Sequence, residues 1–92
     1  MSIKYFPTNI ELENATLVAL KNLGGEASTT EINKEVINIM DLPIEIVTLE
    51  DESGLGTKLE YRLRWIRTNL KTKNKIKNVK RGTWALVNKS EH

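Results

Sequence analysis

The sequence of 92 residues contains no cysteine and a single histidine, His92, at its last position. Without cysteine the chain has no disulfide framework, no thiolate zinc site and no cysteine nucleophile. With the only imidazole at the end of the chain, histidine chemistry on a folded scaffold is excluded as well. We therefore expect a binding module, or a fragment of something larger, with no catalytic residue, metal site, cofactor or small-molecule ligand.

Long hydrophobic runs are also missing. No apolar stretch approaches the roughly 20 residues that a membrane-spanning helix needs, and residues 1–5 lead into no signal-peptide apolar region. The composition, 39% hydrophobic and 28% charged, is that of an ordinary globular domain. We expect a cytoplasmic protein without a membrane partner, in which residues 1–9 are an extended lead-in, residues 10–88 one domain and residues 89–92 a tail.

Charge is distributed unevenly along the chain. Residues 1–56 carry three bases and ten acids, a net charge of −7, whereas residues 57–92 carry eleven bases and two acids, a net charge of +9. Every arginine lies in the second part. Since a positive field concentrates phosphate and raises association rates, this asymmetry predicts a polyanion-binding face; a solvated lysine-rich tail is the alternative.

A first helix is predicted before the double glycine at residues 24–25. Thr8 or Asn9 can cap its start, and the two glycines end it. Residues 26–28 are expected to be a short extended link, with one or two strand residues at most. The apolar side chains at helical spacing that should face the core are Leu12, Ala15, Ala19, Leu20 and Leu23.

A second helix is predicted from Ser28, because Ser28 and Glu31 have the spacing of a capping box. The proline-containing residues 41–43 should end it. Residues 44–49 are either one helical turn or loop, and the acidic residues 50–56 are loop. The side chains expected to face the core are Ile32, Val36, Ile39 and Met40.

A third helix is predicted over residues 57–72. Its core stripe consists of Leu59, Leu63, Ile66 and Leu70, which fall on one side of a helical wheel. Its outward face consists of Tyr61, Arg64, Thr68 and Lys71. Trp65 on one flank should pack against a neighbouring helix, and Arg67 on the other should meet either an acid of the first two helices or a phosphate. Glu60, one turn before Arg64, could pair with it.

Two strands are predicted at residues 76–79 and 83–87, because both are apolar stretches that flank a turn signal. The turn consists of Lys80, Arg81 and Gly82, of which Gly82 is able to take a positive backbone dihedral. Trp84 is expected in the core, where it closes the sheet over the helices.

Three main helices followed by a C-terminal two-stranded hairpin give an α+β fold, the winged helix-turn-helix. A major groove about 12 Å wide admits one helix, and basic side chains beside that helix reach the flanking phosphates. The third helix and the hairpin are therefore the expected surface for double-stranded DNA. The predicted contact residues are Lys58, Tyr61, Arg62, Arg64, Thr68, Lys71, Lys77, Lys80 and Arg81.

The same segments resemble the N-terminal winged-helix domain of Mrr-type restriction proteins. The third helix matches that family's Trp-x-Arg-Thr-x-Leu pattern through Trp65, Arg67, Thr68 and Leu70, and the hairpin matches Arg-Gly-x-Trp through Arg81, Gly82 and Trp84. The similarity extends over roughly residues 7–87. The chain departs from the family at residues 72–75, Thr-Lys-Asn-Lys, where members usually have an alanine-glycine stop.

This resemblance implies a bacterial restriction role: binding DNA, often methylated, and presenting it to a separate metal-dependent nuclease domain that follows in full-length members. The chain alone is then not an enzyme, although its parent would be a type IV-like restriction endonuclease. Two alternatives use the same fold. One is a stand-alone transcriptional regulator; the other is a protein-interaction winged helix that forms a homodimer through Trp65 and residues 44–49.

Overall fold

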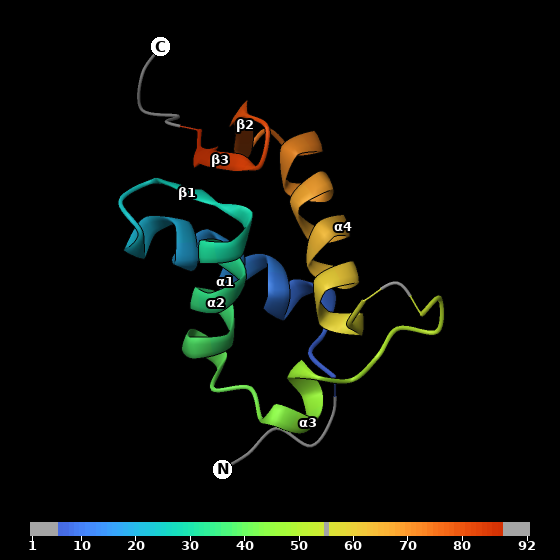
Figure 1. Cartoon of the computed structure of the whole chain (residues 1–92). Coiled ribbons are helices and arrows are strands. Elements are labelled where there is room, and N and C mark those ends of the chain that lie inside the picture. Colours follow the sequence, from blue (N-terminus) through green and yellow to red (C-terminus); the bar gives the residue numbers. More distant parts are fainter. Residues whose placement is uncertain (1–5, 55, 88–92) are drawn as a thin grey trace.

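The computed structural model describes residues 6–54 and 56–87 and is α+β, with four helices and a three-stranded antiparallel sheet. The elements in chain order are α1 (Asn9–Asn22), β1 (Glu26–Ser28), α2 (Thr29–Met40), α3 (Ile44–Val47), α4 (Lys58–Thr72), β2 (Ile76–Lys80) and β3 (Thr83–Leu86). In Figure 1 the sheet lies at the C-terminal end of α4, and α3 lies near its N-terminal end. Within the described residues, no helix is long and apolar enough to cross a membrane.

The sheet has one strand more than the predicted hairpin. β3 is central and pairs antiparallel with both β1 and β2, and Ala27 lies opposite Trp84. The residues 26–28 that were expected to be a link are therefore a strand. The β2–β3 turn has Gly82 at a φ of 77°, as predicted, and the pairing shifts between Asn78 and Lys80, which leaves Val79 as the extra residue of a bulge.

The helix boundaries follow from local signals. Thr8 and Ser28 each accept a hydrogen bond from the backbone N–H of a glutamate three residues later, and that glutamate bonds back, so both capping boxes are complete. At the end of α1, the Gly24 N–H donates to the Lys21 carbonyl and the Gly25 N–H to the Leu20 carbonyl. These two bonds form a Schellman motif, for which Gly24 adopts a positive φ of 90°. Residues 44–47, left open between turn and loop, form the one-turn helix α3.

The core lies between α1, α2 and α4 and continues beneath the sheet. Of the predicted inward residues of α2, Ile32 and Val36 are buried, but Ile39 is wrong, because it is 37% exposed. Thr16 is buried although it was not predicted, and its hydroxyl donates to the Leu12 carbonyl at 2.8 Å. The buried hydrophobic residues are Leu12, Ala15, Ala19, Leu20, Ala27, Ile32, Val36, Leu42, Leu59, Leu63, Ile66, Leu70, Ile76 and Ala85.

Candidate nucleic-acid interface

α4 separates a buried face from an exposed one. All four predicted core residues, Leu59, Leu63, Ile66 and Leu70, are buried. Thr57 caps the helix by accepting the Glu60 N–H at 3.2 Å. The burial of this apolar stripe fixes the rotation of α4 about its axis, and the rotation in turn decides which side chains face outward.

The exposed face carries the four side chains predicted for it, Tyr61, Arg64, Thr68 and Lys71, all of them exposed. The Thr68 hydroxyl donates to the Arg64 carbonyl at 3.2 Å. Within the described residues no ion pair joins Arg64 to Glu60, although their spacing would allow it. The cationic heads of Arg64 and Lys71 therefore remain available to an anion.

Trp65 is exposed, contrary to the prediction that it packs against a neighbouring helix. Its side chain is 52% exposed. It lines a shallow hollow together with Tyr61, Arg64 and Thr68. The centre of the outward face is therefore aromatic as well as cationic; the helical wheel placed Tyr61 on this face but Trp65 on its flank.

Arg67 takes the buried position on the opposite flank. It is 6% exposed, and its Nη1 donates to the Asn33 Oδ1 at 3.0 Å. Burial, and then the charge of Arg64, lower the pKa of the Arg67 guanidinium below its ordinary value. The partner within the chain is therefore an amide of α2 and not one of the predicted acids. Arg67 thus joins α2 to α4.

Two of the predicted DNA contacts, Lys58 and Arg62, have partners within the chain. The Lys58 Nζ and the Arg62 Cζ lie 4.9 Å and 5.3 Å from the centroid of the Phe6 ring, within cation–π range. The Arg62 Nη1 also donates to the Asn9 Oδ1 at 3.0 Å. These two side chains contact the segment that leads into α1, and the structure does not place them with the four residues around the hollow.

The hairpin displays the three predicted cations Lys77, Lys80 and Arg81, all exposed. Lys77 lies opposite Ala85 in the sheet, Lys80 lies opposite Thr83, and Arg81 is in the turn. Lys73, at the end of α4, is different: its Nζ lies 3.0 Å from the Glu13 Oε1 in an ion pair with α1. Its charge is thus partly neutralised within the fold.

Hydrogen bonds between the hairpin and the start of α2 fix the position of this turn. The Thr29 N–H donates to the Gly82 carbonyl at 2.9 Å, and the Trp84 Nε1 donates to the Thr29 Oγ1 at 3.3 Å. Trp84 is partly buried and packs against the core, as predicted. Because both bonds end on Thr29, the basic turn is held beside the N-terminus of α2.

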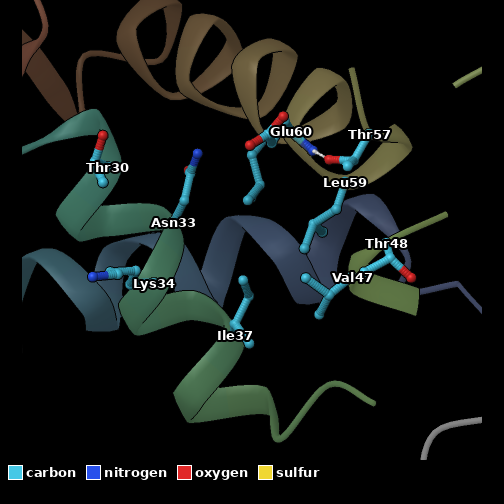
Figure 2. A pocket seen from close by; sticks show the side chains of 10 residues that line it. Thr30, Asn33, Lys34, Ile37, Val47, Thr48, Thr57, Leu59 and Glu60 are labelled. Carbon is cyan, nitrogen blue, oxygen red and sulfur yellow. Dashed lines mark hydrogen bonds between the residues drawn. The ribbon is translucent and has the colours of Figure 1, made fainter. Parts of the chain in front are cut away.

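A second hollow lies between α2, α3 and the start of α4, and sequence reasoning did not predict it. Figure 2 shows Ile37, Val47 and Leu59 pointing toward one another inside it, with polar side chains along its edges. Leu59 and Leu63 of the core stripe also line it, and α3, which borders it, has no fully buried residue. Polar edge residues include Thr30, Asn33, Lys34, Thr48, Thr57 and Glu60.

The sequence matches a known protein family. A family model described as the Mrr N-terminal domain matches residues 11–91, which is nearly the whole chain. Among curated proteins and among solved structures, nothing matches. The match agrees with the resemblance carried by the α4 and hairpin patterns.

Proposed function

The chain belongs to the Mrr N-terminal domain family, and from that premise we propose that it is the DNA-binding domain of an Mrr-like restriction endonuclease. Its role is target recognition, and cleavage belongs to a nuclease domain in a longer parent protein. The element order supports a winged helix-turn-helix: α2 and α4 are the paired helices, β2 and β3 form the wing, and β1 completes the sheet.

The observation that supports this proposal best is a set of cations for which the described residues provide no ion-pair partner. Arg64 and Lys71 extend from the outward face of α4, while the basic turn of the hairpin is tied to Thr29. In the proposed complex α4 enters the major groove and the wing follows the adjacent phosphates. Because the family often acts on methylated DNA, methylated duplex is included among the proposed targets.

The predicted contacts then fall into two groups. Arg64, Thr68 and Tyr61 are proposed to meet the groove, and Lys71 and the wing cations Lys77, Lys80 and Arg81 the phosphates. We assign weaker contributions to Lys58 and Arg62, since their heads already lie against Phe6. Releasing them to DNA would forfeit those contacts.

The test replaces Arg64 and Lys71 together by alanine and measures duplex affinity by fluorescence anisotropy over a range of salt concentrations. We expect at least about a tenfold loss of affinity and a fall of about 1 in the slope of log affinity against log salt, since the loss of the Lys71 phosphate contact removes about one unit. The melting temperature should stay nearly unchanged because both side chains are exposed.

The matched control replaces Lys21 and Lys34, two exposed lysines of the acidic half, by alanine. It makes the same change in net charge and should alter the affinity much less. Equal losses in the two double variants would mean that only net charge matters, and an unaltered affinity of the Arg64/Lys71 variant would show that the face is wrongly assigned.

Self-association is the second candidate, because the side chains predicted for it are exposed. Trp65 is 52% exposed, and Ile44 and Leu49 are exposed as well. A dimer that persists at high salt and is lost on Trp65→Ala, measured by sedimentation, would favour this function over DNA binding.

A further inference from the structure

The hollow on the outward face of α4 has an unusual composition for a surface that reads base edges. Tyr61 and Trp65 are one helical turn apart, so their rings are neighbours on the same side of the helix. Tyr61 is 47% exposed and Trp65 52% exposed. Arg64 and Thr68 complete the lining. Two aromatic rings and a guanidinium are thus presented together to solvent.

Reading of base edges in a duplex relies on side chains that form hydrogen bonds in the plane of the bases, such as arginine, asparagine and glutamine. Indole and phenol rings offer flat apolar faces instead, and such faces stack on nucleobases with little regard to sequence. A guanidinium can stack in the same way or hold the neighbouring phosphate. The chemistry of this hollow therefore favours the face of a base over its edge.

A base within a duplex has both faces covered by its neighbours, so only a base outside the stack can use this surface. From the exposed aromatic pair we infer that the hollow binds one unpaired nucleobase of DNA, between the ring of Trp65 and the side chains of Tyr61 and Arg64. The inference rests on the proposed function, and it narrows the preferred substrate to DNA that carries an unpaired or extruded base.

The bond pattern around the hollow supports this assignment. The Thr68 hydroxyl is engaged with the Arg64 carbonyl at 3.2 Å, so Thr68 already has a hydrogen bond within the helix. Arg64 has no ion-pair partner in the described part of the chain, so its head is available to a phosphate beside the bound base. Stacking surface and anion contact thus come from adjacent turns of one helix.

The experiment compares three duplexes of one sequence by fluorescence anisotropy: a fully paired duplex, the same duplex with a single extra unpaired nucleotide, and that duplex with an abasic site in place of the extra base. Since stacking of one base contributes about 5- to 100-fold in affinity, the duplex with the unpaired base should bind at least about fivefold more tightly than the paired one. The abasic duplex keeps the backbone kink but lacks the base, so its affinity should equal that of the paired duplex.

The variant Trp65→Ala should lose this preference while it keeps the salt-dependent affinity for paired duplex. Trp65→Phe, which retains an aromatic ring, should keep most of the preference and serves as the matched control. Both changes are at an exposed position, and an unchanged melting temperature confirms that the fold is intact.

Three results would overturn the inference. Equal affinity for all three duplexes, with normal salt-dependent binding, refutes the base-stacking role and leaves the proposed function standing. A preference shared by the abasic duplex assigns it to DNA bending. Failure to bind any duplex refutes the proposed function and the inference together.

Discussion

The two ends of α4 are held in different ways. At the C-terminal end, the helix closes with a Schellman motif in which the Lys75 N–H donates to the Leu70 carbonyl at 2.9 Å and the Asn74 N–H donates to the Lys71 carbonyl at 2.9 Å. The Val87 N–H then donates to the Lys75 carbonyl at 3.0 Å, which joins the end of the hairpin to the same segment. This end is part of the sheet's hydrogen-bond network.

The N-terminal end of α4 lies against α3 and the acidic loop, which contribute less to the core than the sheet does at the other end. The Lys58 N–H donates to the Leu49 carbonyl at 2.8 Å, and a single isolated bridge joins Glu50 to Thr57. None of the four residues of α3 is buried, and the hollow of Figure 2 lies beneath Leu59. Packing is therefore less complete here than near the sheet.

The difference shows which part of the molecule orients the candidate interface. The sheet end fixes the angle between α4 and the hairpin, and hence the spacing between the cations proposed to face the groove and those proposed to face the phosphates. The α3 end has room for adjustment, since the side chains around a partly open hollow can move without breaking a close-packed core. Adjustment of α4 on DNA is expected to occur at its N-terminal end.

The largest effect is expected from truncating leucines at the two ends. Leu70→Ala should lower the free energy of unfolding by an amount near the top of the range of about 2–5 kcal/mol, because it leaves a closed cavity beneath the sheet. Leu59→Ala should fall near the bottom of that range, because its site already borders the hollow. Chemical denaturation of the two variants, each compared with the parent, measures both values.

Both variants replace a leucine of α4 by alanine, so each serves as the control for the other. Equal losses would show that the two ends are equally well packed, and a larger loss at Leu59 would reverse the comparison.

An intermediate effect is expected from the bond that holds the hairpin to α2. Trp84→Phe removes the donor to the Thr29 Oγ1 and should lower the free energy of unfolding by about 1 kcal/mol, a typical net value for one hydrogen bond, plus the packing lost with the smaller ring. A double-mutant cycle with Thr29→Val, followed by thermal denaturation, isolates the hydrogen bond. A coupling energy of zero would mean that the hairpin position does not depend on this contact.

The sequence predicts the parts of this fold that depend on residues close together in the chain, and not those that depend on distant ones. The capping boxes at Thr8 and Ser28 and the stripe of α4 depend on residues three or four positions apart, and both predictions are confirmed. β1 was not predicted as a strand because it has three residues and pairs with β3, far along the chain, so nothing local marks it.

The side chains on the two flanks of α4 also depend on contacts that the local sequence does not reveal. Trp65 and Arg67 lie about 100° to either side of Ile66 on a helical wheel, and hydrophobicity predicts that the tryptophan is the buried one. The structure does the opposite, because α2 presents Asn33 to Arg67, whereas Trp65 stays 52% exposed. The docking of α2 decides the outcome, and a wheel drawn for one helix does not contain it.

Asn74 explains why the chain can depart from its family at residues 72–75. Its φ of 63° is the left-handed conformation that the usual glycine supplies, and asparagine tolerates it better than most residues do. The turn into the hairpin is thereby retained. Similarly, the partners of Lys58 and Arg62 could not be predicted, since the ring they share is that of Phe6, more than 50 residues earlier.

The smallest effect is expected from two carboxylates: Glu31, near the sheet end of α4, and Asp51, in the loop before its N-terminal end. The backbone N–H and then the hydroxyl of Ser28 lower the pKa of Glu31, whose ordinary value is 4.5, and hydrogen bonds from the side chain and then the backbone of Ser53 lower the pKa of Asp51. A folded-state pKa below the unfolded one gives stability that is present above the unfolded value and is lost as pH falls through the folded one. Stability should therefore decrease as the pH is lowered from 6 through 4.5 and below.

The two groups should differ in their share of this decrease. Glu31 caps α2 next to the Thr29 contacts of the sheet end, so Glu31→Gln, which keeps an oxygen for the cap, should lower the melting temperature slightly at pH 6, and this difference should vanish at low pH. Asp51 bonds within its own loop, where local opening does not require global unfolding, so Asp51→Asn should change the pH profile of the melting temperature less. Melting curves of the three proteins between pH 6 and 3 decide between these expectations; a larger change for Asp51→Asn would show that the loop end, and not the sheet end, is coupled to the global fold.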